Sequence, residues 1–385
     1  MSSTRTNTSG VFKPERYSSS PEFDRPLKAN LVAARCSVLE SPDLKELCWF
    51  IQGMSLHRGG LRWVAAEIAP LSISNSRLDE WLATLCLDPA TDGELQEIAP
   101  ALRELIAAYA RQRGERGAET EIGRQITGAL DYCSQAHGLI LVSGNPRVGK
   151  TWTAKHWIEQ HFGKGRYCEV PSCADDTSFF MALASALGVT VESNAKRKNL
   201  QPRIEAVLKG GDLVLVLDEC ANLWPGFLHR QHSRPPRVSW VTSMINAGAS
   251  IALLVTPNFS SAEKDFLSHA RWQAAQFYGR IARYVTLPDR VALADLEKIA
   301  RAWLPQGDRR AIEALADVAN LSQKHAAAIE HVVKLATYFA RQDGRDQAEW
   351  PDLKRAITTD VMPSDTALAA ALSQEGRRVP ASGAR

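Results

Sequence analysis

Eight consecutive residues, Gly144 to Thr151, constrain the fold of this chain more than any other feature of its sequence. They read Gly-Asn-Pro-Arg-Val-Gly-Lys-Thr and fit the pattern GxxxxGK[ST]. An apolar segment, Leu139–Ser143, precedes them, and a segment of helical character, Thr151–Gln160, follows. In such a strand–loop–helix unit, glycines let the backbone wrap closely round an anion, and the helix N-terminus attracts negative charge. The motif therefore predicts a phosphate-binding loop.

The loop and the residue after it form the expected nucleotide contacts. Lys150 is expected to reach the β- and γ-phosphates, and the Thr151 hydroxyl is expected to bind Mg²⁺. ATP and Mg²⁺ are therefore the predicted cofactors. The residues of this segment expected to contact the nucleotide are Gly144, Asn145, Pro146, Arg147, Val148, Gly149, Lys150, Thr151 and Trp152.

Short apolar segments alternate with helical ones through the middle of the chain. Strands are expected at Leu139–Ser143, Arg166–Val170, Leu213–Leu217, Ile251–Thr256 and Arg283–Leu287, and helices at Thr151–Gln160, Thr177–Leu187, Ile204–Leu208, Val238–Ala247 and Ala262–Gln276. This alternation predicts an α/β fold with a doubly wound, parallel, five-stranded sheet. On either side of this segment only helical periodicity is found.

The 385 residues leave room for two or three domains. We expect a mobile arm at 1–30, an N-terminal helical domain at 31–110, a phosphate-loop core at 111–290, a helical subdomain at 291–360 and a flexible tail at 361–385. The seven scattered cysteines favour reduced thiols in a cytoplasmic protein. No apolar run approaches the roughly 20 residues of a membrane span, so no membrane partner is expected. The net charge of only +3 does not by itself indicate nucleic acid.

Two carboxylates end the most apolar of the expected strands. Leu213-Val-Leu-Val-Leu is followed at once by Asp218 and Glu219. Ligands bind at the carboxyl ends of parallel strands, so these side chains are expected beside the phosphate-binding loop. Asp218 is predicted to hold Mg²⁺ through its water shell, and Glu219 to act as general base toward the attacking water. A carboxylate at the second position favours hydrolysis over nucleotide binding alone.

Polar residues near the next two strands are further candidates. Thr256 and Asn258 end an apolar strand and are expected to bind the γ-phosphate or the water, although Pro257-Asn258 also suits a turn. Arg280 precedes the last strand and is a candidate catalytic residue that stabilises the charge of phosphoryl transfer, in its own subunit or in a neighbour. Arg283 and Arg271 are alternatives for this role, and surface ion pairing accounts equally well for any one of the three.

Two segments are candidates for DNA binding. The stretch from His229 to Arg237 holds three arginines, two histidines and no acid, so Arg230, Arg234 and Arg237 are candidate contacts to a nucleic-acid backbone. A solvated loop is the alternative. Residues 61–85 resemble a helix-turn-helix in which Arg77 faces DNA. Because Pro70-Leu71 stands where such turns usually have glycine, a plain helical hairpin remains the alternative.

Together these residues resemble the core of an AAA+ ATPase. Within that class the chain is most similar to the ATPases of DNA transposition, the group of bacteriophage Mu transposition protein B, TniB, TnsC and IstB. The likeness rests on Ala129-Leu-Asp-Tyr-Cys, on the loop Gly144–Thr151, and on Phe277-Tyr-Gly-Arg-Ile-Ala-Arg-Tyr. It covers residues 120–290 and makes the C-terminal helices the lid of the AAA+ unit.

The resemblance implies ATP hydrolysis, ATP-dependent and non-specific binding to double-stranded DNA, assembly into a homo-oligomer or helical filament, and recruitment or stimulation of a transposase. Two other functions fit an AAA+ core: an ATPase of the ExeA or loader type acting on a protein partner, and a nucleotide-dependent signalling switch. Many AAA+ lids carry a sensor-2 arginine. Leu321–His325 has none, and Lys324 is the candidate substitute. The adenine pocket is expected only approximately, at Ile122–Ile126, just before the first strand.

Overall fold

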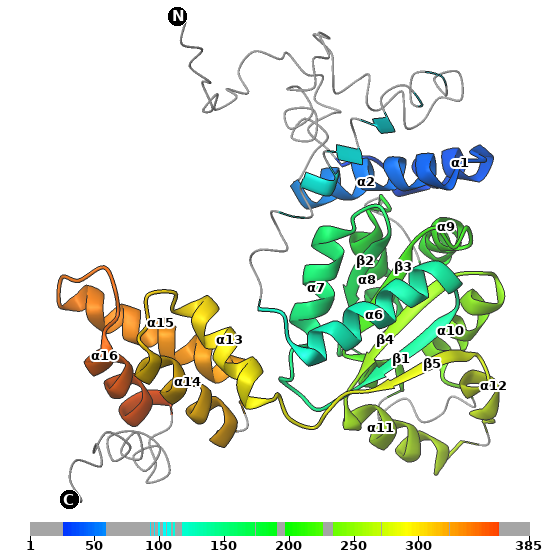
Figure 1. Cartoon of the computed structure of the whole chain (residues 1–385). Coiled ribbons are helices and arrows are strands. Elements are labelled where there is room, and N and C mark those ends of the chain that lie inside the picture. Colours follow the sequence, from blue (N-terminus) through cyan, green and yellow to red (C-terminus); the bar gives the residue numbers. More distant parts are fainter. Residues whose placement is uncertain are drawn as a thin grey trace, which may run out of the picture.

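The computed structural model of the chain describes residues 26–58, 118–173, 175–190, 197–225, 234–270, 272–322 and 324–361, with isolated positions between 93 and 111. Its centre is a parallel five-stranded sheet in the order β2-β3-β4-β1-β5 (Figure 1). The strands are β1 Leu139–Ser143, β2 Gly165–Glu169, β3 Val214–Asp218, β4 Ser250–Val255 and β5 Ile281–Thr286. The predicted α/β fold and its parallel sheet are confirmed.

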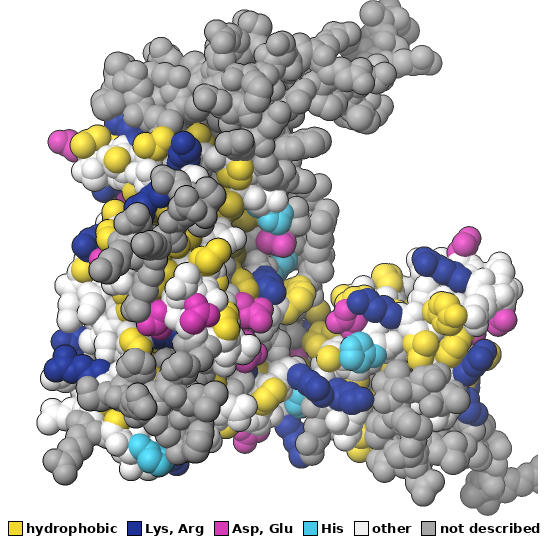
Figure 2. All heavy atoms as spheres, turned by 180° about the vertical axis from the view of Figure 1, so that it is seen from behind, with side chains coloured by type: hydrophobic (Ala, Val, Ile, Leu, Met, Phe, Trp, Pro, Cys, Tyr) yellow, Lys and Arg dark blue, Asp and Glu magenta, His cyan; other side chains and the backbone are white. Residues whose placement is uncertain are grey.

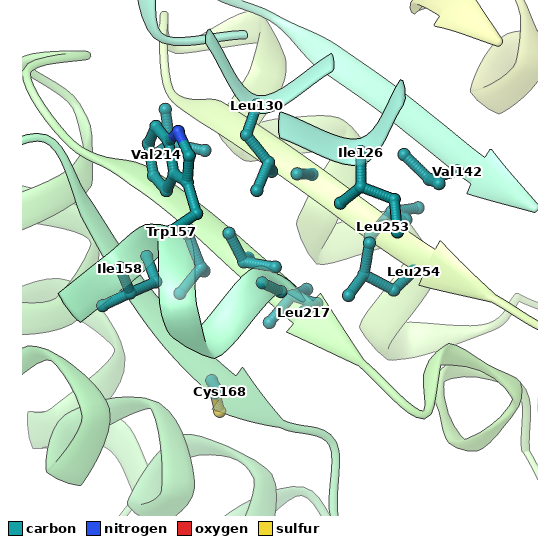
Figure 3. Packing of buried hydrophobic residues seen from close by; sticks show 14 of the residues in the cluster. Ile126, Leu130, Val142, Trp157, Ile158, Cys168, Val214, Leu217, Leu253 and Leu254 are labelled. Carbon is teal, nitrogen blue, oxygen red and sulfur yellow. The ribbon is translucent and has the colours of Figure 1, made fainter. Parts of the chain in front are cut away.

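Helices cover both faces of this sheet, as its apolar central strands require. They are α6 Glu121–Ala136, α7 Lys150–Gln160, α8 Asp176–Leu187, α9 Arg197–Leu208, α10 Pro236–Asn246, α11 Pro257–Leu267 and α12 Ala275–Tyr278, with a 3-10 turn at Cys220–Leu223. Every residue of β3 and β4 is buried. Figure 3 shows Leu130 of α6 and Trp157 of α7 packed over these strands. This packing holds the phosphate-binding loop between β1 and α7.

One predicted helix is divided in the structure. The expected helix Ala262–Gln276 is instead α11, which begins at Pro257 and ends at Leu267, and the separate short helix α12. Proline is well suited to the first turn of a helix, because its missing N–H would have no partner there. The apolar spacing that suggested one helix therefore runs across a break, and the prediction was wrong at both ends.

The first two helices pack directly on the core. α1 spans Ala29–Val38 and α2 spans Pro42–Arg58 (blue in Figure 1). Arg166 of β2 is buried and donates hydrogen bonds to the carbonyl oxygen of Trp49 at 2.9 Å and to Gln52. The Gln52 amide donates to the carbonyl oxygen of Leu187 at 3.1 Å. Residues of α1 and α2 thus share one hydrophobic cluster with the core.

Four helices after β5 form the lid. They are α13 Leu293–Trp303, α14 Arg309–Leu321, α15 Ala326–Gln342 and α16 Trp350–Arg355, continued by a π-helical turn at Ala356–Val361. The lid extends to one side of the core and is joined to it through the segment after β5 (Figure 1, yellow to red). Among the described residues, no helix is both long enough and apolar enough to cross a membrane.

Candidate nucleotide-binding site

The phosphate-binding loop follows β1 and ends where α7 begins. Gly149 is the N-cap of α7 and has φ +104°, a conformation that glycine adopts without strain. The Lys150 ammonium donates to the carbonyl oxygens of Gly144 and Asn145, both at 2.7 Å. Lys150 is only 6% exposed, and this burial lowers its pKa, against the opposing influence of Asp218 and Glu219. The loop thus directs a buried cation toward its own carbonyls, at the carboxyl edge of the sheet.

The first two residues of the loop, Gly144 and Asn145, contact the segment that follows β5. A Cβ on Gly144 would lie 2.9 Å from Cδ1 of Leu287, so this glycine is required by packing against the end of β5. The Asn145 side chain donates to the carbonyl oxygen of Asp289, at 3.2 Å, in the connection to the lid. Neither residue is among those that line the cavity beside the loop, whereas the rest of the predicted segment, Pro146 to Trp152, does line it.

Asp218 lies at the end of β3 beside the first turn of α7. Its Oδ2 accepts hydrogen bonds from the Thr151 hydroxyl at 2.6 Å and from the Tyr167 hydroxyl at 3.0 Å. The two predicted magnesium ligands are therefore in direct contact, and both offer the oxygen atoms that Mg²⁺ prefers. The pKa of Tyr167 is raised by burial and by the neighbouring Asp218 carboxylate. Sequence reasoning missed Tyr167, since only the pairing of β2 with β3 brings it to this carboxylate.

Glu219 turns the chain out of β3. Its φ of +54° is rare for a residue with a side chain, and its N–H donates to Oδ1 of Asp218 at 2.8 Å. The 3-10 turn at Cys220–Leu223 starts immediately afterwards. This geometry leaves the Glu219 carboxylate exposed and facing the cavity. A left-handed backbone conformation beside a buried aspartate is a form of local strain that is found at functional sites.

A cavity of about 840 Å³ lies between these residues and the lid. Its core wall contains Lys150, Thr151, Asp218 and Glu219, together with Thr256 and Asn258 at the end of β4. Thr256 is the N-cap residue of α11, and Asn258 lies in the first turn of that helix. The structure therefore brings together the polar ends of β3 and β4 and the phosphate-binding loop. The chemical roles assigned to these residues remain predictions.

Residues 133–261 match the family described as an AAA domain. This segment of the chain is thus similar to AAA domains. The chain is 24% identical over 231 residues to the ATP-dependent target DNA activator B of Escherichia phage Mu. The aligned region covers 60% of this chain and 69% of that protein. The ATP-dependent target DNA activator B of Escherichia phage D108 is 25% identical over the same coverage. The expected resemblance to this group is thus confirmed.

Two solved structures also match this chain in part. The ORC2 protein of Aeropyrum pernix matches with a TM-score of 0.44 and 19% identity, over 63% of this chain and 68% of that one. The Cdc6p of Pyrobaculum aerophilum matches with a TM-score of 0.45 and 16% identity, over 61% of this chain and 65% of that one.

The lid supplies the other wall of the cavity. This wall is lined by Val291, Ile299, Ala302, Trp303, Ala326, Ala327 and Glu330. The described residues of this wall are apolar except for Glu330, which forms an ion pair with Lys334 at 2.5 Å. Lys324, the predicted sensor-2 substitute, is not among the lining residues. The sequence held no signal for this wall beyond helical periodicity.

The residues near which the adenine pocket is expected, Ile122–Ile126, begin two positions after the cavity-lining residue Thr120. Ile122 and Ile126 are buried against the sheet, at 3% and 0% exposure, and do not line the cavity. Ala118 and Thr120, just before α6, do line it. The apolar part of the cavity thus lies between the segment before α6 and the lid helix α13.

Arg280 lies at the opposite end of the sheet from the phosphate-binding loop. Ile281, which follows it, pairs with Leu139 at the start of β1, whereas the loop follows Ser143 at the end of that strand. Strand geometry separates those two ends by about 13 Å. The Arg280 guanidinium donates to Oδ1 of Asn246 at 2.6 Å. A catalytic role for Arg280 is therefore possible only at the nucleotide of a neighbouring subunit. Arg283 donates to the carbonyl oxygen of Gly128 at 3.1 Å, and Arg271 is outside the described residues.

The structure contradicts the prediction that Arg237 contacts DNA. Its side chain is 6% exposed, and its guanidinium donates to the carbonyl oxygens of Asn222, Cys173 and Asp175 at 2.7–2.9 Å. Such a buried network fixes the N-terminus of α10 to the core and leaves no donor for a phosphate. Arg234 is exposed just before α10. Arg230, Arg77 and the helix-turn-helix predicted at 61–85 lie outside the described residues.

Proposed function

We propose that this AAA-type ATPase binds MgATP in the cavity between core and lid, assembles in that state on double-stranded DNA, and recruits or stimulates a transposase. The observation that carries the proposal is the similarity to the phage target DNA activators, which spans 60% of the chain. The cavity provides the chemistry for ATP, because Lys150, Thr151, Asp218 and Glu219 all line it.

The residues of the core wall divide the work of hydrolysis. Lys150 and the N-terminus of α7 would hold the phosphates, and Thr151 and Asp218 would hold Mg²⁺, whose charge stabilises the phosphate oxygens. The exposed Glu219 carboxylate would accept a proton from the attacking water. Thr256 or Asn258 would orient that water or the γ-phosphate. The nucleobase would occupy the apolar region near Ala302 and Trp303.

Hydrolysis would then require a second copy of the chain. Because Arg280 is remote from its own cavity, it would stabilise the charge of phosphoryl transfer in the neighbouring subunit. We expect Arg280→Ala and Glu219→Gln each to turn over slowly alone and their mixture to regain turnover, because an Arg280→Ala subunit keeps an intact site to which a Glu219→Gln neighbour can supply its Arg280. Turnover that is unchanged by mixing would instead indicate that Arg280 acts structurally.

The DNA-binding part of the proposal is tested by assembly. Wild-type protein with MgATP and a labelled duplex should form oligomers or filaments visible by electron microscopy, and ADP should not support them. The same preparation with Lys150→Ala is the control for ATP dependence. Binding should weaken steeply with salt, as counterion release requires. Absence of any DNA-dependent assembly would reject this function.

An ATPase that acts on a protein partner is the second candidate. It is favoured by the burial of Arg237 and by the surface in Figure 2, where the described Lys and Arg side chains are scattered over core and lid rather than gathered in one patch. Salt-insensitive or absent DNA binding, with ATP turnover retained, would support this candidate over the first.

A further inference from the structure

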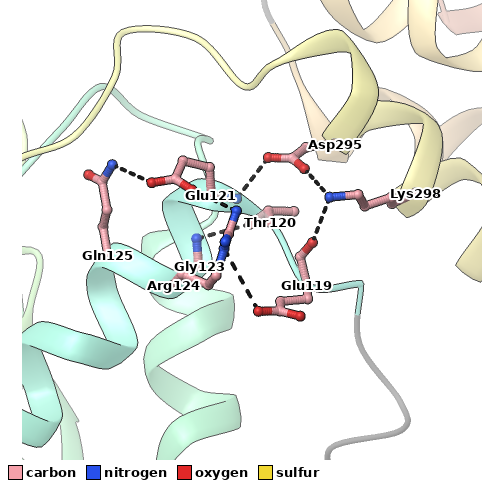
Figure 4. A network of polar contacts seen from close by, with 8 residues as sticks. All are labelled: Glu119, Thr120, Glu121, Gly123, Arg124, Gln125, Asp295 and Lys298. Atoms are coloured by element: carbon pink, nitrogen blue, oxygen red, sulfur yellow. Dashed lines mark hydrogen bonds and ion pairs between the residues drawn. The ribbon is translucent and has the colours of Figure 1, made fainter.

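A small polar network joins the lid to the segment that precedes α6 (Figure 4). Asp295, in the first turn of α13, accepts a hydrogen bond from the backbone N–H of Glu121 at 2.8 Å. Lys298, one turn later, donates to the Asp295 carboxylate at 2.7 Å and to the carbonyl oxygen of Glu119 at 3.3 Å. Two of these contacts connect the start of α13 to residues 119–121, which are 174 or more positions away in the chain.

The network is built into the structure rather than lying loosely on its surface. Asp295 is only 5% exposed, although it is charged and lies in the lid. Burial raises the pKa of Asp295, but the hydrogen bonds from Lys298 and from the Glu121 N–H outweigh it, so the pKa lies below its usual value. A buried carboxylate that stays ionised, with one donor from the start of α6 and one from its own helix, is a firm connection.

The face of α13 that begins with this network is the face that lines the cavity. Ile299, Ala302 and Trp303 line the cavity and stand four, seven and eight positions after Asp295. These intervals place all four side chains on one side of an α-helix. A contact that fixes Asp295 therefore also fixes which way the cavity-lining side chains of α13 point.

The other partner of the network forms the facing part of the cavity. Thr120 lines the cavity and caps α6, since its hydroxyl oxygen accepts the N–H of Gly123 at 2.9 Å. A Cβ on Gly123 would lie only 3.8 Å from Oγ1 of Thr153 in α7, the helix that follows the phosphate-binding loop. The N-terminus of α6 is therefore held between the lid and the phosphate-binding unit.

We propose that Asp295, supported by Lys298, is a positioning residue for the nucleobase end of the cavity, because it sets the lid face of α13 against the segment that carries Ala118 and Thr120. This inference rests on the proposed binding of ATP in that cavity. Asp295 need not touch the nucleotide. Its effect is exerted through the spacing of the two apolar surfaces that enclose the base, at a distance from the groups that hold the phosphates.

The test compares two ligands on the full chain, MgATP and magnesium tripolyphosphate, which has the phosphates without a nucleoside. Asp295→Ala removes a charge-assisted bond and should weaken MgATP about tenfold. Tripolyphosphate affinity should stay within about twofold of wild type, because the loop alone holds that ligand. In turnover, the KM for ATP should rise while kcat is kept. Amide exchange at Glu121 should become faster, since its N–H loses its acceptor.

Three further variants separate positioning from general damage to the lid. Asp295→Asn keeps an acceptor for the Glu121 N–H and should recover most of the MgATP affinity, and Lys298→Met should cost less than Asp295→Ala. Arg309→Ala removes an exposed lid ion pair with Glu313 and should change neither ligand. Wild-type MgATP affinity in Asp295→Ala, or equal losses for both ligands, would overturn the inference. Failure of the wild-type protein to bind either ligand would instead reject the proposed function.

Discussion

The two walls of the cavity differ in chemistry and in how they are built. The core wall is polar and comes from the ends of β1, β3 and β4, where backbone geometry alone brings Lys150, Asp218 and Thr256 together. The described residues of the lid wall are apolar except for Glu330, and come from α13, from α15 and from the segment just before α13. The difference teaches that the polar wall is fixed by strand pairing, whereas the apolar wall depends on how the lid helices are held against the core.

This division predicts the largest effect for a change in the core wall that removes phosphate binding. Lys150→Ala should weaken ATP by about a hundredfold or more, since a buried cation with hydrogen-bonding reach to the phosphates is lost. Isothermal titration should show no ATP binding in the micromolar range, and the thermal stabilisation by MgATP should disappear. Lys209→Ala, which removes a lysine outside the cavity, serves as control. Tight ATP binding by the Lys150 variant would show that the core wall is not the phosphate site.

The same division explains what could be predicted from the sequence. The core wall was predictable because its residues stand next to one another in short motifs. The strands before Gly144 and Asp218 were predictable as buried because each is a continuous apolar run. Arg237 could not be placed, because a run of basic residues does not show that its last member begins a helix and is directed inward to carbonyl oxygens. Ile299 and Trp303 have the spacing of any amphipathic helix, so only the packing of α13 on the core assigns them to the cavity.

A second change in the core wall should separate chemistry from binding. Glu219→Gln should lower ATP turnover by about 10²–10⁴-fold while ATP affinity stays within a few fold of wild type, because the amide keeps the shape and loses the base. Steady-state phosphate release and nucleotide titration measure the two quantities. Glu169→Gln, at the exposed end of the neighbouring strand, should leave both unchanged. Unaltered turnover in the Glu219 variant would exclude Glu219 as general base.

A change in the lid wall should affect binding of the nucleoside and spare the phosphates. Trp303 is 40% exposed and lines the cavity, so its ring is available to stack on a base. Trp303→Ala should weaken ATP about tenfold, the value of one base–aromatic stack, without changing the affinity for magnesium tripolyphosphate. Tyr338→Ala removes another exposed lid aromatic that does not line the cavity, and should change neither ligand. Equal losses for both ligands would mean that the walls do not divide the ligand in this way.

The smallest expected effect concerns the one charge on the lid wall. Glu330 faces a cavity that is to receive a polyphosphate, and its ion pair with Lys334 is partly exposed, so solvent screens much of its field. Glu330→Gln should therefore tighten ATP by only about twofold to threefold, and should tighten ADP less, because ADP carries less negative charge. Lys334→Met leaves Glu330 without its cation and should change the ratio of the two affinities in the opposite direction. Parallel titrations of both variants measure the ratio of the affinities for ATP and ADP. If that ratio stays at the wild-type value, the lid wall distinguishes nucleotides by shape alone, and only the core wall acts on the ligand through charge.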